Sequence, residues 1–126
     1  MKIILFSFGF KHGHPEADIV LDIRFLPNPY WVPELKEHSG CEAPVAAYVL
    51  ESAAGKEFLA QLESFLVFLL NKHREACRME MSCAVGCTGG RHRSVAVIEH
   101  LRHVFSDKLL RQDDELITLH RDIEKK

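Results

Sequence analysis

The segment with the clearest chemical potential in this chain is Gly86-Cys-Thr-Gly-Gly-Arg-His-Arg-Ser94. Its glycines allow φ above zero and close backbone approach, so a turn built from them can point several N–H groups at one place. Arg91, His92 and Arg93 add side-chain cations where a helix is expected to begin, and a helix N-terminus carries partial positive charge. We therefore predict an anion cradle here, with phosphate as its best-matched ligand.

Two other interpretations of this segment stay open. The first is a tight turn that needs glycine for its shape and leaves its arginines in solvent. The second is an enzyme, because the segment fits Cys-x5-Arg-Ser and resembles the phosphate loop of the cysteine-dependent phosphatases. That chemistry uses a thiolate nucleophile, here Cys87, an arginine that holds the phosphoryl oxygens, here Arg93, and a general acid. Asp22 is the candidate acid, although neighbouring Arg24 favours its ionised form.

Two further segments place polar, cationic and aromatic residues directly after expected strands. One is residues 7–15, which contains Lys11 and His12, and the other is residues 22–31. Ligands of parallel sheets bind beyond the carboxyl ends of the strands, so all three segments share one edge if their strands are parallel neighbours. Lys11 and His12 would then face the site, or would otherwise lie in a solvated loop.

Within residues 22–31 the notable side chains also have two interpretations. Asp22 and Arg24 would orient a hydroxyl or amine of a ligand, or would form an ion pair that brackets the strand end. Tyr30 would stack on a sugar or a base. We expect Trp31 instead to pin this proline-rich loop to the core.

The periodicity of apolar residues predicts the elements that must position these segments. Strands are expected over 2–8, 18–24, 79–86 and 115–121, and helices over 43–51, 56–76 and 92–105. The helix at 56–76 repeats apolar residues at spacings of three and four, and Phe65 and Phe68 in it should be deeply buried or form an oligomer face. Alternation of strands and helices predicts one α/β domain over residues 1–126, a layered fold with a mostly parallel sheet flanked by helices.

The composition excludes several classes of protein. The chain has 126 residues, a net charge of −2 and 47% hydrophobic residues, which suits one globular domain and excludes a disordered or collagen-like chain. Its longest apolar run, residues 65–70, is far shorter than the roughly 20 residues of a membrane-spanning helix. The near-neutral charge does not by itself indicate nucleic-acid binding, which would need a local basic patch.

The cysteines and the N-terminal residues bear on the cellular compartment. Cys41, Cys77, Cys83 and Cys87 form no Cys-x-x-Cys pair, and the first residues do not resemble a secretory signal. We therefore expect a cytoplasmic protein with reduced thiols. The histidines at positions 12 and 14 are better explained by a histidine-rich loop than by a metal site, so no metal is expected.

Four motifs give the chain a resemblance to a known family. Ser7-Phe-Gly-Phe-Lys-His-Gly, Asp22-Ile-Arg-Phe-Leu-Pro-Asn-Pro, the segment 86–95 and the closing His120-Arg-Asp-Ile-Glu-Lys125 match the C-terminal domain of the RapZ family, also called YvcJ, in order and approximate spacing. Full-length members resemble P-loop nucleotide-binding proteins in an N-terminal domain that is not among these 126 residues. The Walker A pattern is absent from the chain, so ATP or GTP activity is not carried over.

The resemblance implies a binding and regulatory domain with no catalytic residue and no cofactor. In the enteric member this domain senses glucosamine-6-phosphate, and Thr88, Gly89, Arg93 and the aromatic at position 30 match its pocket. Position 30 is Tyr here and His there, which changes a titratable side chain into one that cannot become a cation. With the loop analysis above, the expected ligand-binding residues are Lys11, His12, Asp22, Arg24, Asn28, Tyr30, Cys87, Thr88, Gly89, Gly90, Arg91, His92, Arg93 and Ser94.

The resemblance also implies macromolecular partners. The enteric domain binds small regulatory RNA and oligomerises, so a regulatory RNA, a ribonuclease or other protein, and a second copy of this chain are expected partners. The expected RNA-binding residues are Lys108, Arg111, Arg121, Lys125 and Lys126. RNA phosphates would be repelled by the acidic residues at 113–115, Asp113, Asp114 and Glu115. Each phosphate contact that is lost weakens RNA binding.

Overall fold

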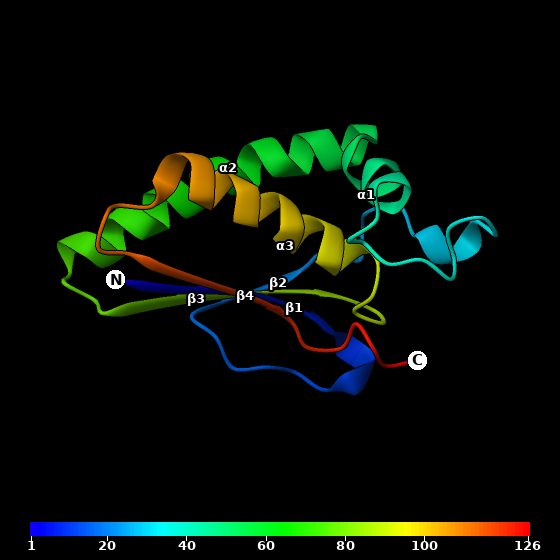
Figure 1. Ribbon diagram of the computed structural model, residues 1–126, viewed down its shortest axis with the longest axis horizontal. Coiled ribbons are helices and arrows are strands. Elements are labelled where there is room, and N and C mark those ends of the chain that lie inside the picture. The colour runs from blue at the N-terminus through cyan, green and yellow to red at the C-terminus, as the bar shows by residue number, and fades with distance from the viewer.

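A computed structural model describes all residues, 1–126, as one α/β domain whose four strands form a single parallel sheet (Figure 1). The strands are β1 (Lys2–Gly9), β2 (Ile19–Asp22), β3 (Glu80–Cys87) and β4 (Glu115–His120), in the spatial order β2-β3-β1-β4. Every neighbouring pair is parallel. The predicted strands and the predicted fold class are therefore confirmed, although β2 is shorter than the expected 18–24.

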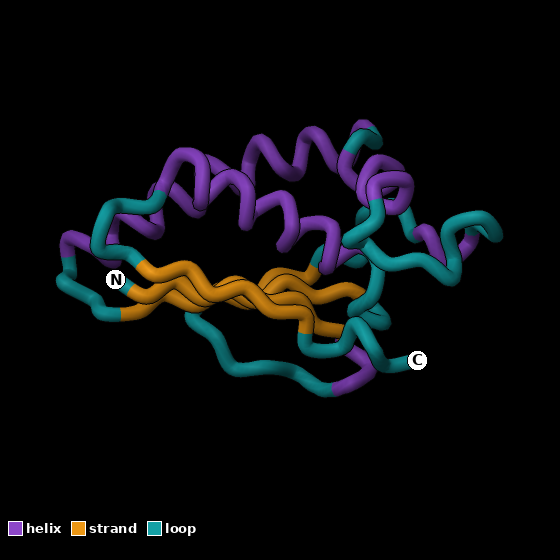
Figure 2. The backbone as a smooth tube through the Cα atoms, in the orientation of Figure 1, coloured by secondary structure: helices purple, strands orange, loops and turns teal.

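Three helices cover one face of the sheet, while the segment between β1 and β2 crosses the other face (Figures 1 and 2). They are α1 (Ala43–Leu50), α2 (Ala53–Glu75) and α3 (Arg93–Val104), and α3 continues into a π-helical turn over Phe105–Leu109. All three helices fall within a few residues of the ranges predicted from periodicity. None of the helices is long and apolar enough to cross a membrane.

The core lies between the sheet and the helices. Alternate residues of β1 and β3, among them Leu5 and Val85, point to this layer because successive side chains of a strand face opposite ways. Leu62 and Leu66 of α2 and Leu101 of α3 meet them there, all buried. Burial of this apolar surface fixes the helices over the sheet, and so fixes where α3 begins.

The sequence expectation for the phenylalanines of α2 is wrong as far as burial is concerned. Phe65 is 46% exposed and Phe68 is 54% exposed. The buried stripe of α2 is made by Leu59, Leu62, Leu66 and Leu70. At 100° per residue, Phe65 falls beside that stripe and Phe68 falls on nearly the opposite face of the helix, so both side chains are turned away from the buried leucines. Their alternative role, as a face between copies of the chain, stays a prediction.

Candidate functional site

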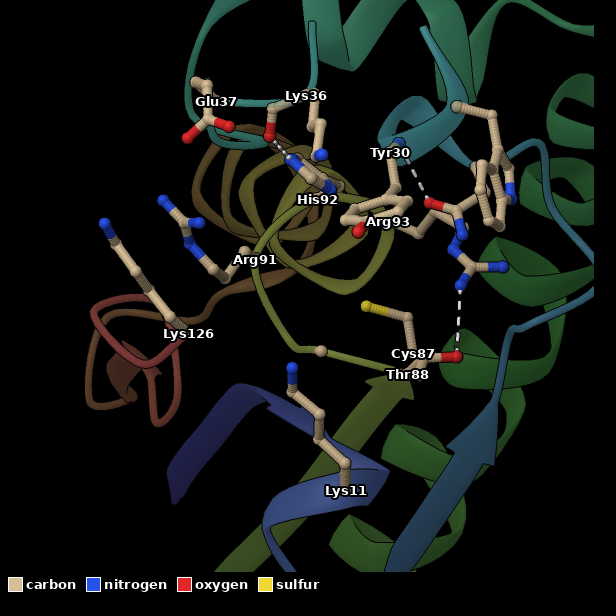
Figure 3. Close-up of a pocket in the computed structure, with 13 residues that line it drawn as sticks. Lys11, Tyr30, Lys36, Glu37, Cys87, Thr88, Arg91, His92, Arg93 and Lys126 are labelled. Atoms are coloured by element: carbon tan, nitrogen blue, oxygen red, sulfur yellow. Dashed lines mark hydrogen bonds between the residues drawn. The ribbon is translucent and has the colours of Figure 1, made fainter. Parts of the chain in front are cut away.

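The carboxyl ends of all four strands lie at one edge of the sheet, as expected for parallel strands. Gly9 pairs with Cys87 and Asp22 pairs with Gly86 in the register of the sheet. A cavity of about 560 Å³ opens beside this edge, a size suited to a small metabolite. Figure 3 shows the turn after β3, the segment after β1, residues 28–37 and the end of the chain gathered around it.

The structure brings nine of the fourteen predicted ligand-binding residues to this cavity. They are Lys11, Asn28, Tyr30, Cys87, Thr88, Gly89, Arg91, His92 and Arg93. The other five do not line it: His12, Asp22, Arg24, Gly90 and Ser94. Residues from all three segments therefore meet at one edge of the sheet, as predicted. Of the other five, Asp22 and Arg24 pair with each other and Ser94 contacts Cys87, whereas the buried Nε2 of His12 has no hydrogen-bond partner.

Close backbone contact sets the shape of the glycine-rich turn. Gly90 has φ of +78°, a conformation that favours glycine, whereas Gly86 and Gly89 do not use positive φ. A Cβ built on Gly90 would lie 2.6 Å from the Gly9 nitrogen, and one built on Gly9 would lie 2.4 Å from the Gly89 carbonyl carbon. The end of β1 and the turn after β3 thus touch through their main chains, which leaves Gly89 facing the cavity.

Arg93 supplies a buried positive charge at this site. Its side chain is 5% exposed, and one terminal nitrogen donates to the carbonyl oxygens of Arg24 (2.7 Å) and Leu26 (3.3 Å). The other terminal nitrogen donates to Thr88 Oγ1 at 3.4 Å, and Nε has no hydrogen-bond partner. No carboxylate pairs with Arg93 within salt-bridge distance. A buried guanidinium without a counter-charge is costly, and an anion in the adjoining cavity would offset that cost.

Cys87 lies at the base of the cavity beside the first turn of α3. Its Sγ is 3.1 Å from Ser94 Oγ, and the Ser94 N–H donates to Sγ at 3.5 Å. Cys87 is 2% exposed and Ser94 is fully buried. Ser94 therefore anchors the thiol at the start of α3, and it does not line the cavity.

Asp22 and Arg24 form the ion pair that was one of their two interpretations. Arg24 Nε donates to Asp22 Oδ1 at 2.9 Å and a terminal nitrogen donates to Oδ2 at 2.6 Å. The Arg24 guanidinium also lies 4.2 Å from the centre of the Phe10 ring. The hydrogen bond from Arg24 is the main cause that lowers the pKa of Asp22, so this carboxyl is ionised at neutral pH and poorly suited to act as a general acid.

His92 connects the turn to the segment that forms the other wall of the cavity. Its Nε2 lies 2.9 Å from the Lys36 carbonyl oxygen, to which it donates. Burial lowers the pKa of His92, so the ring is neutral at pH 7. The Gly40 N–H donates to the Arg91 carbonyl oxygen at 2.9 Å. Residues 36–40 are thereby fixed against the start of α3.

Sequence reasoning missed three residues that line the cavity: Trp31, Lys36 and Glu37. Trp31 is 77% exposed, so the expectation that it pins its loop to the core is wrong. Tyr30 and Trp31 meet edge to face at 5.0 Å, and Lys36 Nζ lies 4.6 Å from the Tyr30 ring centre. Lys36 and Glu37 follow Pro33 rather than a strand, so no sequence signal directed attention to them.

The structure does not gather the expected RNA-binding residues into one patch. Lys108 and Arg111 precede β4, and the remaining three follow it, so the length of the six-residue strand, about 20 Å, separates the two groups. Figure 1 shows the turn before β4 and the C-terminus at opposite ends of the sheet. Arg121 and Lys125 are also ion-paired with Asp122, whereas Lys126 lines the cavity.

Asp122 is a buried anchor that sequence reasoning did not single out. It is fully buried and accepts from the Gly9 N–H at 2.7 Å, from Arg121 at 2.8 Å and from Lys125 at 2.6 Å. Burial alone would raise the pKa of Asp122, but hydrogen bonds from these three partners hold that pKa well below its ordinary value. The end of the chain is thereby attached to the end of β1.

The cavity is strongly cationic. Five of its lining side chains are lysine or arginine, and Glu37 is the single carboxylate among them. The helix start at Arg93 adds the positive end of α3. The fold and the site together define a parallel α/β domain with a cationic pocket at the carboxyl edge of its sheet.

The chain belongs to the RapZ C-terminal domain family, which matches it over residues 1–124. Curated relatives carry the name nucleotide-binding protein. One from Nitratidesulfovibrio vulgaris is 48% identical over 98% of this chain, and one from Geotalea daltonii is 46% identical over 99%. A third, from Nocardia farcinica, is 42% identical over 98%. The resemblance stated from the four motifs is confirmed.

The chain spans about two-fifths of the length of the relatives it matches: 41% of the first, 43% of the second and 40% of the third. The match is therefore to one domain of longer proteins, and their nucleotide-binding name describes the whole of each.

Replacement of single glycines tests the backbone contact at the turn. Gly90→Ala places a side chain at positive φ and against the Gly9 main chain, so it should lower the free energy of unfolding by at least about 1 kcal/mol. Gly89→Ala is the matched control, since its Cβ would meet only Lys11, at 3.9 Å. Urea unfolding of both variants measures the difference, and equal stabilities would contradict this account of the turn.

Asp122 should also contribute stability that depends on pH. A carboxyl whose pKa is lowered by folding stabilises the native state above its ordinary pKa of 3.8, and this contribution is lost as pH falls below that value. Asp122→Asn should therefore cost about 3 kcal/mol at pH 7. The gap between variant and wild type should narrow when urea unfolding is repeated from pH 5 down to pH 3. A gap that stays constant with pH would show that the charge of Asp122 is not what stabilises the fold.

Proposed function

We propose that this domain binds a small phosphorylated metabolite, an amino-sugar phosphate such as glucosamine-6-phosphate, and responds to it without transforming it. The observation that carries the proposal is the buried Arg93 guanidinium, which has no carboxylate partner and adjoins a cationic cavity. A phosphate group supplies the missing negative charge and accepts several hydrogen bonds at once.

The phosphate end of the ligand fits the turn after β3. Thr88 Oγ1 and a terminal nitrogen of Arg93 are already within hydrogen-bond distance of each other, so both can donate to one anion after a small rearrangement. Lys11 and Arg91 reach the cavity from two further directions (Figure 3). Gly89 leaves the backbone accessible, because a Cβ there would have only one neighbour within 4 Å.

The sugar end fits the wall formed by residues 28–37. Tyr30 and Trp31 present aromatic surface, which packs well against the apolar face of a sugar ring. Glu37 is the only carboxylate of the cavity, so it is the natural partner for an ammonium group on the sugar. A ligand with a phosphate at one end and an ammonium group at the other would place its negative charge beside Arg93 and its positive charge beside Glu37.

The phosphatase alternative has less support from the geometry. The Cys87 thiol lies at the base of the cavity, which suits a nucleophile. Its candidate acid is unsuitable, because Asp22 is ion-paired with Arg24 and does not line the cavity. Cys87→Ser separates the two functions: ligand binding should persist, whereas any phosphate release should vanish.

We also propose that the domain binds RNA. The binding surface would lie where Lys11, Arg91 and Lys126 come together, since all three line the same cavity. Phosphate contacts make affinity fall steeply with salt. Lys126→Ala should lower the slope of log affinity against log salt concentration by about one unit, and Lys108→Ala at the far end should leave it unchanged. Equal effects of both changes would contradict this location.

Calorimetric titration with glucosamine-6-phosphate, glucosamine and inorganic phosphate tests the ligand. We expect the sugar phosphate to bind most tightly, and Arg93→Ala to weaken that binding by at least about 100-fold, since a charged hydrogen-bond donor is lost. Arg93→Lys keeps the positive charge but loses the paired N–H donors of the guanidinium, and should retain part of the affinity. Arg78→Ala, at the opposite edge, is the control. Absence of heat with all three ligands in the folded wild type would overturn the proposal.

Glu37 should decide between an amino sugar and a neutral one. In Glu37→Gln, affinity for glucosamine-6-phosphate should fall by roughly tenfold while affinity for glucose-6-phosphate stays level or rises, because the carboxylate no longer pairs with ammonium or repels phosphate. Parallel titrations of the two sugar phosphates measure this. An equal change for both ligands would show that Glu37 does not contact the amine.

A further inference from the structure

Three potential metal ligands from distant parts of the sequence meet outside the anion-binding cavity. Cys41 precedes α1, Glu99 lies in α3 and His120 ends β4. One ligand atom of each, the thiol sulfur, a carboxylate oxygen and an imidazole nitrogen, lies within 4.8 Å of the other two. None of the three residues lines the cavity described above.

His120 is oriented toward this cluster by its neighbours. Its Nδ1 lies 2.8 Å from Oγ of the fully buried Ser7, and its Nε2 lies 2.9 Å from Glu99 Oε2. Glu99 Oε2 can only accept, so Nε2–H donates to it while no metal is bound. A metal would take the place of that proton on Nε2, and the Ser7 hydroxyl, which can donate or accept, would then accept from Nδ1–H. Metal-binding histidines are held in this way, by a second hydrogen bond from the ring nitrogen that does not bind the metal.

Glu99 is oriented in a similar manner. Its Oε1 accepts from Arg102 at 2.8 Å, which leaves Oε2 directed at His120. The carboxylate therefore has one oxygen bound by Arg102, and its other oxygen lies at the centre of the cluster, where it accepts from His120.

Cys41 completes the set from a segment whose backbone is fixed. Gly40 packs against the first turn of α3 so closely that a Cβ there would lie 2.5 Å from the Ala96 nitrogen, and the Cys41 N–H donates to Ser39 Oγ at 3.2 Å. Cys41 is exposed and forms no disulfide. A metal at this position would therefore be reachable from solvent.

We propose that Cys41, Glu99 and His120 bind a divalent metal ion of the zinc class. A thiolate, a carboxylate and an imidazole are ligands that Zn²⁺ accepts together, and two negative ligands neutralise the ion. Tetrahedral ligand atoms sit roughly 3.5 Å apart at zinc bond lengths. Zinc binding would therefore open the 2.9 Å separation of His120 Nε2 and Glu99 Oε2 slightly and shorten the longer separations, which do not exceed 4.8 Å. Three protein ligands leave the fourth position to water. Binding releases the thiol proton and any proton held between His120 and Glu99 to solvent.

Cobalt is the probe for this site, because Co²⁺ in a tetrahedral site absorbs in the visible and a thiolate ligand adds a near-ultraviolet charge-transfer band. The experiment uses the reduced full chain without a histidine tag. The wild type should show both signals at one equivalent of Co²⁺. Cys41→Ser should abolish the charge-transfer band and weaken cobalt binding by at least about tenfold, and His120→Gln should weaken it as much.

Matched control variants keep the test specific. Cys77 is also exposed and His103 is an exposed histidine of α3, so Cys77→Ser and His103→Gln should leave both signals unchanged. His14→Gln removes one histidine of the pair that flanks Gly13 and should likewise have no effect. Because Cys41 is exposed, Cys41→Ser is expected to fold, which circular dichroism verifies.

A second readout is thermal unfolding with Zn²⁺. Saturating zinc should raise the unfolding temperature of the wild type and leave that of Cys41→Ser unchanged, since a ligand that binds only the native state stabilises it. A wild type without the charge-transfer band, or a band that persists in Cys41→Ser, would overturn the proposal.

Discussion

The structure depends on the direct contact between the end of β1 and the turn after β3. Gly9 and Gly90 approach so closely that neither tolerates a Cβ. Asp122 stabilises this contact by accepting from the Gly9 N–H. This contact decides where α3 starts, and therefore where Cys87 and Arg93 stand. The chain end is placed by the same contact, because Arg121 and Lys125 both pair with Asp122.

The electrostatics of the cavity follow from this arrangement. Packing of α3 against the sheet buries Arg93, and the oxygen atoms that accept from its guanidinium are all neutral, from two main-chain carbonyls and Thr88. Arg24, at the same edge, differs because its positive charge is balanced by the Asp22 carboxylate. This difference is the basis for proposing a ligand contact for Arg93 and a structural role for Arg24.

Much of this arrangement could be predicted from residue order. Apolar residues repeating every two or every 3.6 positions predicted the strands and helices. The rule that ligands of parallel sheets bind beyond the carboxyl ends of the strands predicted that the three segments share one edge. What could not be predicted depends on contacts between residues distant in sequence. Lys36 and Glu37 reach the cavity only because His92 and Arg91 hold their segment, and Cys41, Glu99 and His120 meet only in three dimensions. Phe65 is exposed because it lies outside the stripe of leucines through which α2 packs on the core.

The hydrogen bonds that hold residues 24–40 have a consequence for the thermodynamics and the kinetics of recognition. His92 donates to the Lys36 carbonyl, and the Arg91 carbonyl accepts from the Gly40 N–H. Arg93 donates to the carbonyls of Arg24 and Leu26. The wall of the cavity is therefore hydrogen-bonded to the turn before α3 and to the first residue of α3 through contacts that need no ligand. A receptor ordered in advance loses little conformational entropy on association. For the proposed ligand, capture would then be a single bimolecular step, and differences in affinity between ligands would arise mainly from their dissociation rates.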